Sequence, residues 1–132
     1  MEEIRWKQRF QNLRFAFGQL CEFMEAGELN KFETQGLVKC FEYTFELSWK
    51  TLKDFLDEEG FTDIKSPRDT IKQAFQSGYL IQGRLWLEAL EKRNLMSHTY
   101  NEEIKNEVVG LIREKYFQMI SELVGFFHGK PI

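Results

Sequence analysis

The longest apolar segment of the chain contains FEYTFELSWK at residues 41–50. Its apolar residues recur every three or four positions, the period of an α-helix, and the pattern runs from about Thr34 to Glu59 before Gly60 ends it. Two apolar stripes follow this helix, formed by Leu37, Phe41, Phe45, Leu52 and Phe55 and by Val38, Trp49 and Leu56. A helix that is apolar around most of its circumference must be covered on several sides. We therefore expect a second copy of the chain to help cover it.

Little polar surface remains on this helix. Glu46 and Lys50 lie on the remaining polar strip, four residues apart, at the spacing of a surface ion pair. Such pairs contribute little to stability. We expect the two side chains to form a weak surface pair without a catalytic role.

The segments around this helix also follow a helical period. The first predicted helix carries an apolar stripe of Trp6, Phe10, Leu13, Phe17, Leu20 and Met24. A break at residues 26–30 connects it to the long helix. Ser66 and Pro67 predict the start of a third helix, because serine caps a helix and proline suits its first position. Gly78 is expected to end that helix.

Two more helices complete the pattern. A fourth follows Gly83 and leads into residues 93–100, and a fifth begins after Asn101 and carries apolar residues to Leu123. No strand pattern competes with these helices. The sequence therefore predicts an all-α fold, an antiparallel up-down bundle of four to five helices that forms a single domain over residues 1–132.

The composition favours a cytosolic protein without a general affinity for nucleic acid. Cys21 and Cys40 lie inside predicted helices, where reduced core thiols are expected. The N-terminus lacks a signal-peptide pattern and no apolar stretch approaches membrane-spanning length, so we expect a cytoplasmic protein with no membrane contact. The net charge is −3, but residues 65–98 carry six basic and three acidic side chains. This local excess suits a small phosphate ligand, although an ordinary solvated helix face has the same composition.

The side chains that could bind a phosphate or transfer a proton are concentrated in residues 93–100, Arg-Asn-Leu-Met-Ser-His-Thr-Tyr. The chain has no glycine-rich phosphate loop and no paired metal-ligand spacing elsewhere. Asn94 and His98 are four apart, so on a helix the amide could orient the imidazole. Arg93 lies on a different side from His98, and a joint site therefore requires the helix to end near Ser97 or a second copy to contribute.

Each of these side chains also has a purely structural interpretation. Arg93 could pair with a carboxylate, Asn94 could cap the helix, and His98 could satisfy a backbone carbonyl. Tyr100 could pack at a corner between two helices. Both interpretations stay open at the level of the residues.

The spacing Arg93-Asn94-x-x-x-His98 resembles the signature of HEPN domains, which are all-helical modules, and the added Tyr100 resembles their HepT branch. The run at residues 41–50, the Ser-Pro-Arg at residues 66–68 and the segment around Trp86 resemble proteins described as nucleotidyltransferase substrate-binding subunits. The resemblance covers roughly residues 5–125.

This resemblance implies a homodimeric HEPN-like bundle encoded near a minimal nucleotidyltransferase, the two forming a toxin–antitoxin pair. The chain would be the toxin, a metal-independent ribonuclease that needs no cofactor and acts on tRNA or mRNA. Arg93, Asn94 and His98 would be its catalytic residues, with Arg93 and His98 of both copies lining one cleft. Tyr100 would accept AMP from the transferase, which would silence the enzyme.

Two other functions remain possible at this level. The chain could be a non-catalytic substrate-binding subunit of a two-component nucleotidyltransferase, or a helical interaction module without chemistry. The presence of Arg93, Asn94, His98 and Tyr100 together favours the nuclease, because a binding subunit needs no proton-transfer group.

Overall fold

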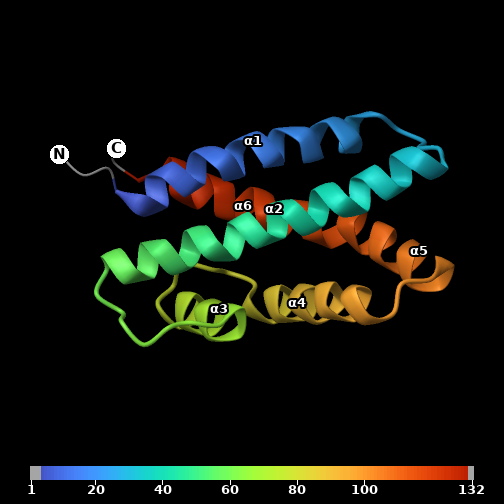
Figure 1. Cartoon of the computed structure of the whole chain (residues 1–132). Coiled ribbons are helices and arrows are strands. Elements are labelled where there is room, and N and C mark those ends of the chain that lie inside the picture. The colour runs from blue at the N-terminus through green and yellow to red at the C-terminus, as the bar shows by residue number, and fades with distance from the viewer. Residues whose placement is uncertain (1–3, 131–132) are drawn as a thin grey trace.

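The computed structural model describes residues 4–130, and within them the chain is helical throughout, apart from its connections. The helices are α1 (Arg5–Glu25), α2 (Lys31–Glu58), α3 (Pro67–Gln76), α4 (Gly83–His98), α5 (Glu102–Leu111), the π-helical segment η1 (Ile112–Tyr116) and α6 (Phe117–His128). α1 and α2 run antiparallel, α3 and α4 lie along the opposite side of α2, and α5 and α6 return toward the N-terminal end (Figure 1). The predicted all-α bundle is confirmed.

The helix boundaries follow from capping side chains. Ser66 accepts a hydrogen bond from the Asp69 backbone N–H at 3.1 Å, as predicted for the start of α3, and Asn101 caps α5 through the Ile104 N–H at 2.9 Å. α2 begins at Lys31, earlier than the expected Thr34. Asn30 and Glu33 form a capping box at its start, in which each side chain accepts a hydrogen bond from the other residue's backbone N–H.

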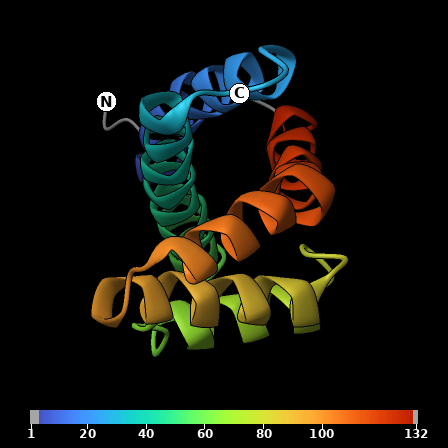
Figure 2. The same cartoon turned by 90° about the vertical axis from the view of Figure 1, so that its right-hand side faces the viewer.

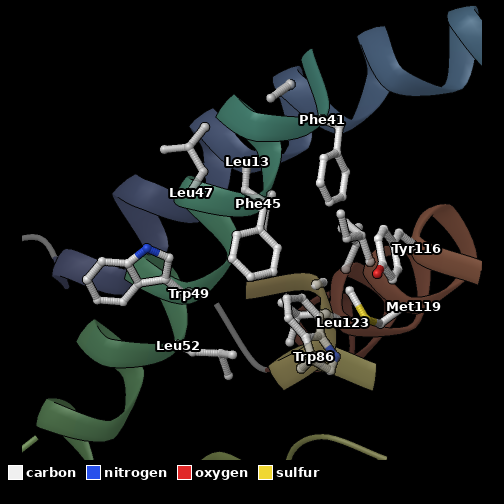
Figure 3. Close-up of a cluster of buried hydrophobic side chains, with 14 of the residues drawn as sticks. Leu13, Phe41, Phe45, Leu47, Trp49, Leu52, Trp86, Tyr116, Met119 and Leu123 are labelled. Atoms are coloured by element: carbon white, nitrogen blue, oxygen red, sulfur yellow. The ribbon is translucent and has the colours of Figure 1, made fainter. Parts of the chain in front are cut away.

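The core lies where the helices face one another, around a shared interior in the end-on view (Figure 2). Aromatic side chains from α2, α4 and η1 meet there, with ring centroids of Phe41 and Tyr116 5.5 Å apart and those of Phe45 and Trp86 5.6 Å apart (Figure 3). All four side chains are buried. These rings connect the element that carries residues 93–98 to the central helix, so the core fixes the position of α4 relative to α2.

A single chain covers α2 almost completely. Every residue of its two predicted stripes is buried, and among its large apolar side chains only Phe32 and Tyr43 are exposed. The expectation that α2 needs a second copy to cover it is therefore wrong, because α1, α3, α5 and α6 of the same chain all pack on this helix. Self-association itself stays a prediction. None of the helices within residues 4–130 is long and apolar enough to cross a membrane.

The predicted fifth helix is interrupted by the π-helical segment at Ile112–Tyr116. Before this segment α5 packs on α2 and α4, and after it α6 packs on α1 and α2. Val108, Ile112 and Tyr116 are four residues apart and all buried. The wider turn of a π-helix keeps residues at this spacing on the same side of the rod. The wider turn thus lets one continuous rod change the elements that it covers.

Tyr116 is buried, and its hydroxyl donates a hydrogen bond to Glu88 Oε1 at 2.8 Å. Burial and this hydrogen bond raise the pKa of Tyr116 above its ordinary value, so the phenol stays protonated. Tyr116→Phe is expected to lower the free energy of unfolding by about 1–3 kcal/mol, because it leaves the half-buried Glu88 carboxylate without its donor. Urea denaturation followed by circular dichroism measures this change, and an unchanged midpoint would show that water replaces the phenol at no cost.

Candidate functional site

The polar cluster at residues 93–100 lies at the end of α4 and in the connection to α5. α4 ends at His98, and Thr99 is already extended, with φ −138° and ψ 104°. The helix therefore does end near Ser97, but His98 still belongs to its last turn. Tyr100 lies beyond the end of the helix. The direction of its side chain therefore does not follow from the rotation per residue that relates Arg93 to His98.

A groove of about 990 Å³ runs between the N-terminal half of α2 and this end of α4. In Figure 1 these two ends of α2 and α4 lie on the right, where the two helices diverge. From α2 the groove is lined by Phe32, Gln35, Gly36, Lys39, Glu42, Tyr43 and Glu46. From α4 and the following connection it is lined by Arg93, Met96, Ser97 and Tyr100. Two of the four predicted site residues, Arg93 and Tyr100, thus share one groove.

Arg93 is held in this groove by a carboxylate of α2. Its Nη2 forms an ion pair with Glu46 Oε2, and its Nη1 donates to Asn94 Oδ1 at 3.0 Å. Glu46 Oε1 also lies 3.5 Å from the ammonium of Lys50, so the predicted Glu46–Lys50 pair is present. The structural interpretation of Arg93, pairing with a carboxylate, is therefore correct for the single chain.

The charge of Glu46 is favoured by its neighbours. Burial alone would raise its pKa, but three groups together outweigh burial and lower the pKa below its ordinary value. They are the indole N–H of Trp49, which is buried and makes no hydrogen bond of regular geometry, the guanidinium of Arg93 and the ammonium of Lys50. Glu46 is thus a stable carboxylate partner for Arg93 at neutral pH.

His98 lies on another side of α4. Its side chain is exposed, does not line the groove, and makes no hydrogen bond or ion pair with another residue of the described range 4–130. At about 100° per residue, His98 is turned by roughly 140° from Arg93, whereas Ser97 is turned by only about 40°. One chain therefore does not bring the imidazole and the guanidinium together.

Asn94 does not orient His98 in the single chain. Its amide oxygen accepts from Arg93, and its backbone carbonyl accepts from the Ser97 hydroxyl at 2.7 Å. A charged guanidinium is a strong hydrogen-bond donor, and it occupies the Asn94 amide oxygen. The proposed role of Asn94 beside His98 stays a prediction for an assembly in which Arg93 has another ligand.

Sequence reasoning missed the contribution of α2 to the groove. Glu46, 47 residues before Arg93, is a tertiary partner that no local pattern identifies. A signal was nevertheless present, because Phe32, Lys39, Tyr43 and Glu46 recur at intervals of three, four and seven along one side of the helix. Within residues 4–130, no group of three or more His, Cys, Asp and Glu side chains is placed to hold a metal ion.

Glu46→Gln is expected to lower the free energy of unfolding by up to about 1 kcal/mol at pH 7, the scale of a partly exposed ion pair. Because the folded pKa of Glu46 lies below its ordinary value, the pair stabilises the fold above that ordinary value and loses this effect as the pH falls through the folded pKa. The difference between wild type and variant should therefore shrink on acidification. Urea titrations at pH 7 and pH 3 test this, and a difference that grows at pH 3 would contradict it.

Comparison with known proteins identifies the family to which the chain belongs. Residues 8–127 match the family described as nucleotidyltransferase substrate binding protein like. The chain belongs to this family. The match includes α2, α3 and α4, and with them Arg93 and Tyr100, so the groove lies inside the region that defines membership.

The chain is also similar to a curated protein and to a solved structure. A probable ribonuclease HepT of Haemophilus influenzae is 31% identical over 72 residues, which cover 52% of this chain and 49% of that protein. The chain thus matches about half the length of this curated relative. The crystal structure of a protein from Thermus thermophilus matches with a TM-score of 0.76 and 29% identity, covering 86% of this chain and 96% of that one. The resemblance to the HepT and nucleotidyltransferase substrate-binding family is confirmed.

Proposed function

We propose that this chain is the ribonuclease and toxin of a pair whose second member is a minimal nucleotidyltransferase. The observation that carries the proposal is the end of α4, where a guanidinium faces a groove shared with Tyr100 and an unpaired imidazole follows five residues later. The name of the Haemophilus influenzae relative, probable ribonuclease, supports the reaction, and the family description supports the transferase as partner.

The reaction needs no metal. His98 takes the proton from a ribose 2′-hydroxyl, whose oxygen attacks the adjacent phosphorus. The bond from phosphorus to the 5′-oxygen breaks, and that leaving oxygen takes a proton from water. The products are a 2′,3′-cyclic phosphate and a 5′-hydroxyl. Arg93 stabilises the negative charge that develops on the non-bridging phosphate oxygens.

This reaction requires two copies of the chain. Arg93 and His98 lie on different sides of α4, and Asn94, Leu95 and His98 are all exposed on the side away from the groove. A homodimer whose copies meet beside the groove, through this side of α4, would bring His98 of one chain to Arg93 of its partner and leave the groove itself open to RNA.

A specific observation favours a second candidate, a non-catalytic substrate-binding subunit of the nucleotidyltransferase. Arg93 is neutralised by Glu46 in the single chain, and the family description names substrate binding rather than cleavage. In this function the groove would present Tyr100 to the transferase, and His98 would have no role.

Incubation of the purified protein with end-labelled RNA in the presence of EDTA distinguishes the two functions. We expect cleavage that EDTA does not abolish and products that end in a cyclic phosphate. The substrate-binding function predicts intact RNA at every protein concentration. Cleavage that needs added Mg²⁺ would contradict the metal-independent mechanism.

A further inference from the structure

Three exposed aromatic rings line the groove between α2 and α4. Phe32 is 77% exposed, Tyr43 56% and Tyr100 49%, and all three are groove residues. Only seven large apolar side chains in residues 4–130 are exposed, so the gathering of three of them in one groove is not the general character of the surface. Exposed rings of this kind offer flat faces to a ligand.

The charges of the groove cancel within the chain. Lys39 lies 3.4 Å from Glu42, and Arg93 is paired with Glu46. Two cations and two carboxylates therefore leave no net charge along the lining. A ligand bound here gains more from contact with the rings than from a positive field, even where it carries phosphate groups.

The α2 side of the groove is long and regular. Phe32, Lys39, Tyr43 and Glu46 lie along one side of the helix, and the fourteen rises of 1.5 Å from Phe32 to Glu46 span about 21 Å. Stacked bases of one strand are about 3.4 Å apart, so a short run of nucleotides fits this length. The rings are separated by polar residues, whereas the centre of a protein–protein interface is depleted of charged residues.

We propose that this groove binds single-stranded RNA by base stacking, with Phe32, Tyr43 and Tyr100 as platforms and with Lys39 and Arg93 contacting phosphates. The inference rests on the proposed function and adds the surface that holds the substrate. The aromatic platforms explain how an acidic protein engages RNA, because stacking tolerates any base and needs little net positive charge.

Fluorescence anisotropy with a labelled single-stranded 2′-O-methyl oligonucleotide tests the groove, since this probe lacks the 2′-hydroxyl and cannot be cleaved. The double variant Phe32→Ser and Tyr43→Ser is expected to weaken binding by about tenfold or more for each ring removed. The matched control is Phe15→Ser, a similarly exposed ring on α1 outside the groove, which should bind as wild type. An abasic strand of the same length should bind weakly to every variant.

Salt dependence and free nucleotide add two further measurements. Two phosphate contacts predict a slope of log affinity against log salt of no more than about 1.4 in magnitude. AMP alone should bind much more weakly than the strand, and binding of AMP as tight as the oligonucleotide would assign the groove to a mononucleotide instead. A steep slope, equal binding of the abasic strand, or no loss in the double variant would overturn the proposal.

Size-exclusion chromatography with light scattering tests the alternative occupant of the groove, a second copy of the chain. If Phe32→Ser and Tyr43→Ser convert a dimer into a monomer, the rings belong to the contact between copies and the inference fails. The outcome is separable from the nuclease proposal. Ring-dependent binding of the oligonucleotide without cleavage of unmodified RNA would retain the groove and reject the nuclease, and cleavage without such binding would do the reverse.

Discussion

His98→Ala is expected to lower the rate of RNA cleavage by about two to four orders of magnitude, because proton transfer by a positioned imidazole contributes that much to such reactions. The side chain is exposed and makes no hydrogen bond or ion pair with the described residues, so its removal should leave the fold unchanged. Single-turnover cleavage of end-labelled RNA in EDTA measures the effect. His128, the other histidine, is also exposed but lies outside the groove on α6, and His128→Ala serves as the control.

The same variant tests whether the site is shared between copies. Arg93→Ala should also be inactive, but Arg93→Ala and His98→Ala each retain the residue that the other lacks. When they are unfolded and refolded together, half of the dimers contain one of each, and one of their two sites is complete, so about one quarter of wild-type activity should return. Activity that stays at the level of the single variants would place both residues in one chain and contradict the composite cleft.

The parts of the fold that local chemistry determines could be predicted from the sequence. The starts of α3 and α5 depend on Ser66 and Asn101, whose side chains cap backbone N–H groups three residues away, and both were identified. The start of α2 depends on Asn30 and Glu33 in the same way, and their capping box begins the helix at Lys31, before the expected Thr34. Caps are short-range interactions, and a single sequence contains them in full.

The parts that depend on tertiary packing could not be predicted. The apolar circumference of α2 indicated coverage on several sides, but the pattern does not say whether neighbouring helices or a second copy provide it. In the structure the helices of the same chain do so. The π-helical turn at Ile112–Tyr116 likewise reflects a change of packing partners along one rod rather than a local preference.

The candidate site divides in the same way. Arg93, Asn94, His98 and Tyr100 were found because their spacing is local. Their arrangement in space could not be predicted, because it depends on where α4 ends and on the ion pair of Arg93 with Glu46 of α2. Glu46 competes with any anion for Arg93, and its position decides how much of the groove's positive charge a ligand meets.

Adenylylation of Tyr100 is expected to abolish RNA cleavage, with a residual rate at least about a hundredfold below that of the unmodified protein. In this modification the transferase would direct the phenol oxygen onto the α-phosphorus of ATP, pyrophosphate would leave, and a tyrosine phosphodiester of AMP would remain. Tyr100 and Arg93 line the same groove, so the new negative charge and the adenosine would occupy the space beside the guanidinium. RNA phosphates would then meet both repulsion and a filled groove.

Intact-mass measurement after incubation with ATP, Mg²⁺ and the neighbouring transferase, followed by the cleavage assay on the same sample, tests this effect. Tyr100→Phe keeps the ring and lacks the phenol oxygen, so it should gain no mass and should cleave RNA equally well with and without the transferase. Tyr43→Phe removes the other exposed phenol of the groove and should still gain AMP and lose cleavage on modification. If Tyr43→Phe escapes modification and Tyr100→Phe does not, the acceptor lies on α2, and the groove rather than the α4 motif determines where the transferase acts.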